Sequence, residues 1–223
     1  MQENYRKNGH MKSVWILGTS KDINSLNSSW FLGKDVIGIN TSGSLVEGVG
    51  GHLNHWVSYD CLHAHFLEWV LSTKMDSCRK WIFRPYSEGH PVVGSFLPEH
   101  PEFENVKHRN VRFFDVNKPF TLDPFVVDEP TGTRLDSHEF TVFTAISLAV
   151  GLGCDSIHMR GLSFGGSHFD DNQNDPKLDR VYCQQASYFK KYMLPLLKAR
   201  GIPIVNETKN AQYFFDGWEL VER

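Results

Sequence analysis

The chain has 223 residues, of which 40% are hydrophobic and 22% charged, and its formal net charge is -3. This composition supplies a sizeable core and excludes an intrinsically disordered protein, and the charge predicts no bulk binding to nucleic acid. No run of about 20 apolar residues is present, so no transmembrane segment is expected, although peripheral attachment to a membrane stays open. Residues 1–12 lack the apolar stretch of a signal peptide, and the four cysteines lack C-x-x-C spacing. Both features indicate a reduced, cytoplasmic protein.

Strand-like and helix-like patterns alternate along most of the chain. Short apolar runs predict strands, in chain order, at 14–17, 36–39, 56–60, 80–83, 111–114, 156–159 and 202–205. Helical spacing follows near 22–26, 63–72, 141–151 and 181–200. The alternation predicts a single α/β domain, 1–223, with a mostly parallel sheet and helices on both faces. Pro203 places the last strand at a sheet edge, since proline donates no ladder hydrogen bond.

The middle of the chain has a different composition. Seven of the ten prolines lie between Pro85 and Pro130. Proline at this density breaks helices and disfavours central strands. We therefore expect a lid or small subdomain at about 84–137, built around one short strand, 111–114.

Small and polar residues stand where the predicted strands end. In a parallel sheet these positions share one edge, and loops at that edge bind nucleotides and phosphates. The first loop offers two hydroxyls and backbone amides, although its hydroxyl residues can also be simple helix caps. Arg160 has the charge to neutralise a diphosphate, or to pair with a buried carboxylate. The candidate ligands of a donor are Gly18, Thr19, Ser20, Asn40, Asp60, Arg160 and Asn206.

The helix that starts at Thr141, the strand after it and the turn Gly161-Leu162-Ser163-Phe164 carry a resemblance to known families. Together with the Gly18 loop and Asn40, they resemble the bacterial sialyltransferases of glycosyltransferase family 42 and the group of archaeal 6-hydroxymethylpterin diphosphokinase. The resemblance implies a Rossmann-like sheet. It also implies that the Gly18 loop holds phosphate, that Asn40 contacts a cytidine nucleotide and that Thr141 contacts the sugar donor. Ser163, also a candidate ligand of the donor, stands where these families have aspartate.

The loop after the 156–159 strand contains the best catalytic candidates. His168 has an imidazole that titrates near neutral pH and can take a proton from an acceptor hydroxyl. Asp170 can orient it, and Asp170 or Asp171 can hold Mg²⁺ on a diphosphate. The same composition is also ordinary for a solvated surface loop.

Three functions are compatible with these residues. The favoured one is a transferase with a nucleotide-activated donor, most simply a sialyltransferase-like glycosyltransferase that needs no cofactor and acts on a glycan or small-molecule acceptor. The second is pyrophosphoryl transfer from Mg-ATP in the same cleft. The third is a non-catalytic protein that binds a nucleotide or sugar phosphate, because Ser163 replaces the families' aspartate and no histidine stands near Gln184, where the sialyltransferases have theirs. Homo-oligomerisation is left open.

Overall fold

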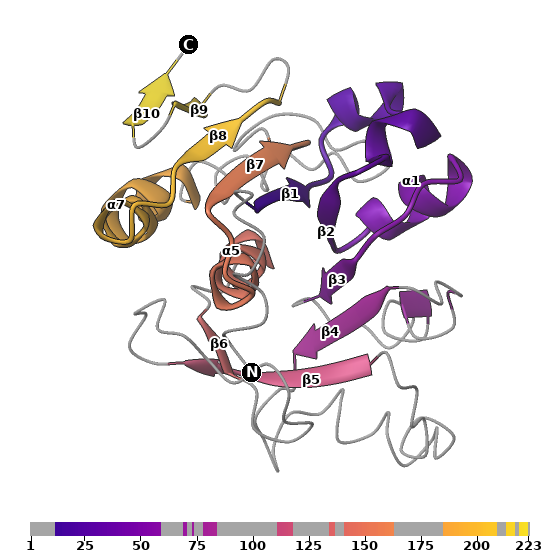
Figure 1. Cartoon of the computed structure of the whole chain (residues 1–223), viewed down its shortest axis with the longest axis horizontal. Coiled ribbons are helices and arrows are strands. Elements are labelled where there is room, and N and C mark those ends of the chain that lie inside the picture. The colour runs from indigo at the N-terminus through magenta and orange to yellow at the C-terminus, as the bar shows by residue number, and fades with distance from the viewer. Residues whose placement is uncertain are drawn as a thin grey trace.

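The computed structural model describes residues 12–58, 69–70, 73, 78–83, 111–117, 134–136, 141–162, 185–208, 213–216 and 219–222. Eight strands form one sheet in the order β6-β5-β4-β3-β2-β1-β7-β8, and every neighbouring pair is parallel (Figure 1). Their bounds are β1 Ser13–Leu17, β2 Asp35–Ile39, β3 His55–Ser58, β4 Arg79–Phe83, β5 Val111–Asn117, β6 Arg134–Asp136, β7 Ser156–Arg160 and β8 Ile204–Asn206. A separate antiparallel pair consists of β9 (Tyr213–Asp216) and β10 (Glu219–Glu222).

Helical segments join the strands and are mostly short. The longest described α-helix, α5, precedes β7, and the others follow β1, follow β2 or precede β8. They are the 3₁₀ turns η2 (Lys21–Ser25) and η3 (Ser28–Phe31), the helices α1 (Ser42–Gly48) and α5 (Thr141–Gly151), the π-helical turn η5 (Phe189–Met193) and α7 (Leu194–Ala199).

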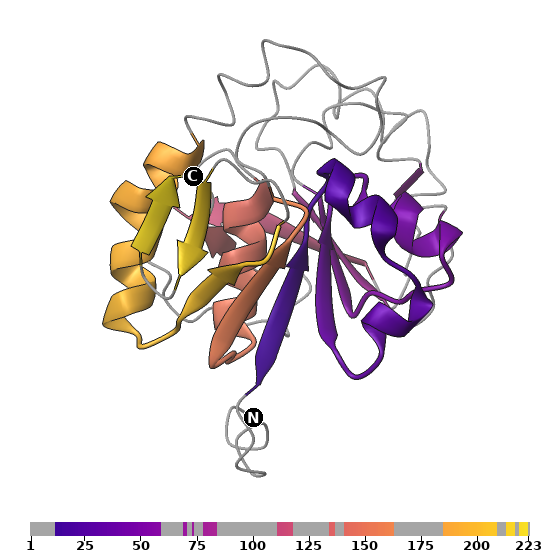
Figure 2. The ribbon, with the colours of Figure 1, turned by 90° about the horizontal axis from the view of Figure 1, so that it is seen from above.

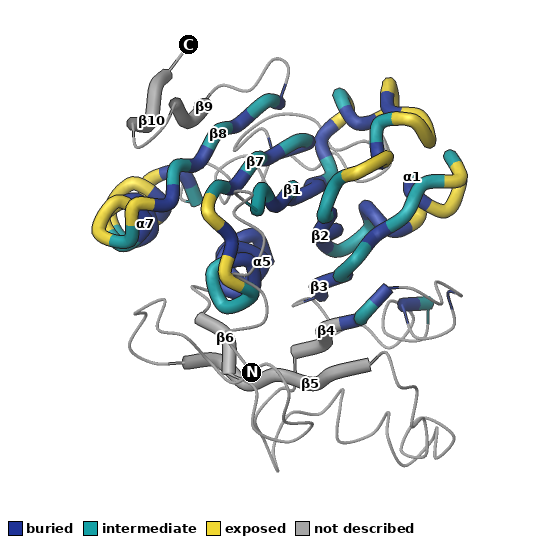
Figure 3. Tube along the Cα trace, in the orientation of Figure 1, coloured by how far each residue is buried: buried dark blue, intermediate teal, exposed yellow. Residues whose placement is uncertain are grey.

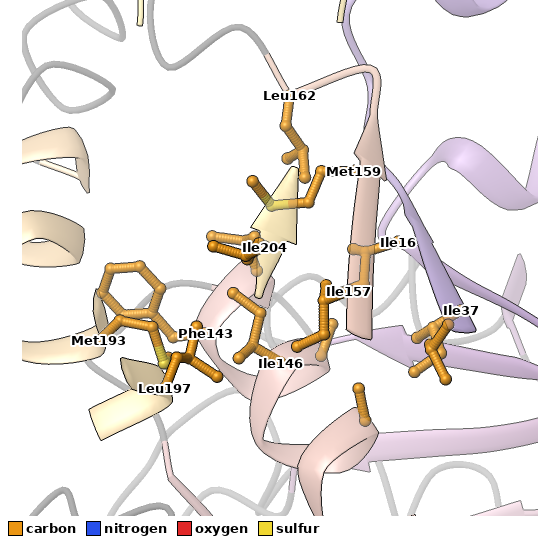
Figure 4. Close-up of a cluster of buried hydrophobic side chains, with 14 of the residues drawn as sticks. Ile16, Ile37, Phe143, Ile146, Ile157, Met159, Leu162, Met193, Leu197 and Ile204 are labelled. Carbon is orange, nitrogen blue, oxygen red and sulfur yellow. The ribbon is translucent and has the colours of Figure 1, made fainter. Parts of the chain in front are cut away.

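The core consists of two clusters, which occupy the two faces of the sheet. On one face, α5, η5 and α7 pack against Val14 and Ile16 of β1 and against the apolar side chains of β7 and β8 (Figure 4). On the other, η2, η3 and α1 pack against Leu17 and Val36. Every residue of 141–149 is buried, which places α5 inside the protein (Figure 3). The prediction of helices on both faces of the sheet is therefore confirmed.

Several elements agree with the sequence and one differs. The strand after Pro203 lies at the end of the strand order, as its proline predicts. The segment 84–137 differs, because it contributes two strands, β5 and β6, to the main sheet rather than one. The short β6 has only three residues, too few for a period-2 pattern to stand out. Most of the expected helix at 63–72 lies outside the described residues.

The centre of the sheet depends on a close approach of two backbones. Gly18 follows β1, and a Cβ atom placed on it would lie 2.3 Å from the carbonyl oxygen of Gly161, which follows β7. Gly161 has a φ of +76°, a left-handed conformation that favours glycine. Only a residue without a side chain fits between these two loops.

We predict that Gly18→Ala lowers the free energy of unfolding by about 2 kcal/mol or more, because the obstructing atom is backbone and cannot rotate away. Gly48→Ala is the matched control. No heavy atom lies within 4 Å of a Cβ placed on Gly48, and alanine favours a helix over glycine. Urea denaturation of both variants measures the difference, and equal stabilities would contradict the close approach.

His55 begins β3 and lies in an environment that disfavours its charged form. Burial, together with the positive charges of Arg79 and Lys12, lowers the pKa of His55 from 6.5 to about 4, with Asp35 acting in the opposite direction. The unfolded chain therefore binds a proton in this range that the folded chain does not. The associated stability is fully present above pH 6.5 and is lost as the pH falls toward 4.

We predict that protonation of His55 lowers the unfolding free energy of the wild type by up to about 3 kcal/mol between pH 7 and pH 4. His55→Gln should flatten this part of the pH dependence, because glutamine does not titrate. Urea denaturation at several pH values measures it, each variant being compared with its own value at pH 7. His52→Gln, in the preceding loop, is the control. Equal slopes in the wild type and His55→Gln would contradict the prediction.

Candidate functional site

The strand order reverses at β1, which lies between β2 and β7. The register pairs Leu17 with Gly38 on one side and with Arg160 on the other, so the three strands end at nearly the same level. Figure 2 shows the arrows of β1 and β7 pointing to the same edge. In open parallel sheets, ligands bind outside the carboxyl ends of the strands where the order reverses. This edge is the candidate functional site.

The loop after β1 is bonded to the loop after β7. The amide of Gly18 donates to the Arg160 carbonyl over 2.7 Å, and the Ser20 amide donates to the Gly161 carbonyl over 2.8 Å. Thr19 lies between them and is half-buried. Two amides of the expected phosphate loop are thus engaged by the protein itself. Phosphate binding by the Gly18 loop, expected from the sequence, stays a prediction, and it would have to use groups of the loop other than these two amides.

An ion pair ties the same two loops together through their side chains. The Nε of Arg160 lies 2.9 Å from a carboxylate oxygen of Asp22, in a geometry that is an ion pair rather than a hydrogen bond. Ser20, expected to cap the following turn, instead donates its hydroxyl to the other oxygen of Asp22 over 2.6 Å. The Asp22 side chain is only 5% exposed, so it places a buried negative charge at the start of η2. This charge disfavours an anion there and compensates Arg160.

Asn40, directly after β2, has a left-handed backbone and is held from three sides. Its φ is 44°, and it is the only non-glycine residue of the described chain with a positive φ. Its amide donates to the Val57 carbonyl over 3.0 Å, its carbonyl accepts from the indole of Trp56 over 2.8 Å, and its Oδ1 accepts from the Thr141 hydroxyl over 3.2 Å. Such conformations cost about 1–3 kcal/mol and cluster at functional sites.

The contact between Asn40 and Thr141 joins two distant parts of the chain. Thr141 is the first residue of α5 and lies 101 positions after Asn40. The unpaired amides at the start of a helix and the helix dipole together attract anions. One turn further along α5, the hydroxyl of Thr144 is fully buried and has no hydrogen-bond partner within the described part of the chain.

Asn206, at the end of β8, uses its side chain to hold the neighbouring loop. Its Nδ2 donates to the Leu162 carbonyl over 2.8 Å, and its Oδ1 accepts from the amide of Thr208 over 3.1 Å. The Thr208 hydroxyl in turn accepts from the Leu162 amide over 2.8 Å. These bonds give Asn206 a structural role, and the contact with the donor expected from the sequence stays a prediction.

One histidine–carboxylate pair near this edge is not among the sequence-predicted site residues. On β7, Nδ1 of His158 lies 3.0 Å from Oε1 of Glu207, which follows β8. The imidazole stacks on Trp15 of β1 with a centroid distance of 4.5 Å. The signal available in the sequence is the alternation of polar Ser156, His158 and Arg160 with apolar residues along β7, which puts the polar side chains on one face.

The remaining predicted residues, Asp60, Ser163, His168 and Asp170, and also Asp171, lie outside the described residues, and their roles stay predictions. Within the described ranges, no group of three or more histidine, cysteine or acidic side chains could hold a metal ion. Nor does a helix of the described chain have the length and apolar content to cross a membrane. No family model, curated protein or solved structure matches the chain.

We predict that Asn40→Ala is less stable than Asn40→Gly by about 1–2 kcal/mol. Neither variant has the side-chain bond to Thr141, so the difference between them isolates the left-handed backbone, which glycine adopts without a steric penalty. Thermal or urea unfolding of the pair measures it. Equal stabilities would show that Asn40 does not hold the left-handed conformation in solution.

Proposed function

We propose that this chain is a transferase that uses a nucleotide-activated donor, most simply a sialyltransferase-like glycosyltransferase with a Rossmann-like sheet. The donor would bind at the edge where β2, β1 and β7 end. The observation that carries the proposal is the hydrogen bond between Asn40 and Thr141. The sequence resemblance gives donor contacts to both residues, and they meet at the reversal of the strand order although they are far apart in the chain.

The start of α5 is the proposed position of the donor phosphate. At Gly18 and Ser20 the amides are engaged, and Asp22 adds a buried negative charge. The first turn of α5 offers a helix dipole of the favourable sign, and α5 has 11 residues to sustain it. The strained Asn40 beside Thr141 would then fix the nucleotide, since a residue held by three hydrogen bonds needs little reorganisation when a ligand binds.

The reaction would join an acceptor hydroxyl to the activated centre of the donor, and the nucleotide phosphate would leave. In the glycosyltransferase form it requires no metal. In the diphosphokinase form Asp170 and Asp171 would hold Mg²⁺, which would supply positive charge to the phosphates. His168 is the base proposed from the residues of its own loop.

We predict that CMP and CMP-N-acetylneuraminic acid raise the midpoint of thermal unfolding without Mg²⁺. At a hundredfold excess over Kd, a chain of this size should gain about 5–10 °C. Thr141→Val should reduce the shift, because it removes the hydroxyl that meets Asn40. Thr144→Val, one turn along the same helix, is the matched control and should keep the shift, because its hydroxyl is fully buried.

The nucleotide panel separates the three functions. A shift with ATP that requires Mg²⁺ would replace the glycosyltransferase by the diphosphokinase. A shift with CMP but no turnover of CMP-N-acetylneuraminic acid or of Mg-ATP would indicate a binding protein. No shift with any nucleotide, in the wild type as in the variants, would overturn the proposal.

A further inference from the structure

The helical segment 185–199, which includes η5 and α7, has an exposed side with positive charge and no acidic residue. The buried side packs into the core, and the exposed side is turned away from the sheet (Figure 3). The sequence contains no aspartate or glutamate between Val181 and Asn206. We name this exposed side the basic face, and it consists of Tyr188, Lys190, Lys191, Tyr192 and Lys198.

The fold makes little use of the lysines on the basic face. Within the described part of the chain, no ion pair involves Lys190, Lys191 or Lys198. A basic side chain in the last turn of a helix offsets the helix dipole, which accounts for Lys198. Lys190 and Lys191 lie near the middle of the continuous segment, where the dipole has little effect. Their charges are therefore available to a partner, although the whole chain has a net charge of -3.

Two tyrosines lie among these lysines. Tyr188 is 40% exposed, and its ring stacks on that of Tyr192 with a centroid distance of 5.8 Å and an angle of 28°. The ammonium of Lys191 lies 4.8 Å from the centroid of the Tyr192 ring. A ring that ends in a hydroxyl suits a boundary between apolar and wet surroundings. The stacking and the ammonium cover part of the ring faces, so less of each face is open to a base.

The shape and chemistry of the basic face favour an extended anionic surface as its partner. Small ligands bind in concave pockets, whereas the outer side of a helix is convex. A single-stranded nucleic acid would need open aromatic faces for its bases, and here the two rings cover one another. An anionic bilayer needs lysines with long apolar stems and aromatic rings at the level of the headgroups. The basic face provides both.

We propose that the basic face attaches the protein peripherally to an anionic lipid bilayer. The ammonium groups of Lys190, Lys191 and Lys198 contact the lipid phosphates, and Tyr188 lies at the level of the headgroups. Each basic residue close to an anionic membrane strengthens binding by about fivefold. Three such residues give a reversible attachment rather than a permanent anchor. This inference does not depend on the proposed function.

Sedimentation of the full chain with vesicles tests the attachment. The wild type should bind vesicles of phosphatidylcholine with phosphatidylglycerol but not vesicles of phosphatidylcholine alone. Raising the salt from about 0.1 M to about 1 M should release it, because the screening length falls from about 10 Å to about 3 Å. Lys190→Glu and, separately, Lys198→Glu should each weaken binding by about tenfold or more. Lys21→Glu, an equal charge change at an exposed position in η2 on the other face of the sheet, is the matched control and should bind like the wild type.

Tyr188→Ala tests the aromatic part without a change of charge. It should weaken binding by about threefold or more, because binding strength scales with the apolar area that the bilayer buries. An unchanged midpoint of thermal unfolding shows that each variant is folded.

Three results would overturn the proposal: a wild type that ignores anionic vesicles, equal binding to neutral vesicles, or unchanged binding of both Lys190→Glu and Lys198→Glu. Fluorescence anisotropy with a single-stranded oligonucleotide tests the other polyanion. Oligonucleotide binding that Lys190→Glu abolishes, with no binding to vesicles, would assign the basic face to a nucleic acid and also overturn the proposal.

Discussion

The contact between the loops that follow β1 and β7 is the constraint on which the site depends. Two backbone hydrogen bonds, one buried ion pair and two glycines without room for a side chain hold these loops together. They fix the level at which the central strands end, and therefore where the polar residues of the edge lie. The same bonds engage amides that the sequence had assigned to phosphate. Because these amides are already bonded within the protein, we place the proposed anion site at the neighbouring start of α5 instead.

Asn40 and His158 differ in how they are held. Asn40 keeps an unfavourable backbone conformation because Trp56, Val57 and Thr141 each bond to it. His158 needs no strain, since a strand positions it and a carboxylate and an indole fix its ring. The backbone conformation of Asn40 costs stability but preorganises the residue for binding, whereas the ring of His158 keeps a nitrogen accessible to solvent. Both lie on rigid elements rather than on long loops, which favours precise geometry.

Much of the fold was predictable because its signals are local. The helix 141–151 has the predicted bounds, and Pro203 correctly indicated a terminal strand. β6 was missed because its three residues are too few to show the alternation of apolar and polar residues that marks a strand. Of the site, the sequence anticipated Asn40 and Thr141, but their mutual contact depends on strand order. The pairing of His158 with Glu207 was beyond sequence reasoning for the same reason, since His158 lies on β7 and Glu207 directly follows the neighbouring strand β8, 49 positions later.

The position of β1 also has a consequence for the order in which the protein is built. One neighbour of β1 is β2, which follows soon after it, but the other is β7, whose Ser156 pairs with Ser13 although it lies 143 positions later in the chain. During synthesis at about 5–20 residues per second, β1 has one open side for on the order of 10 s. In that time the unpaired backbone N–H and C=O groups of this side can form hydrogen bonds with other chains. Newly made protein should therefore depend on chaperones more than its final stability suggests.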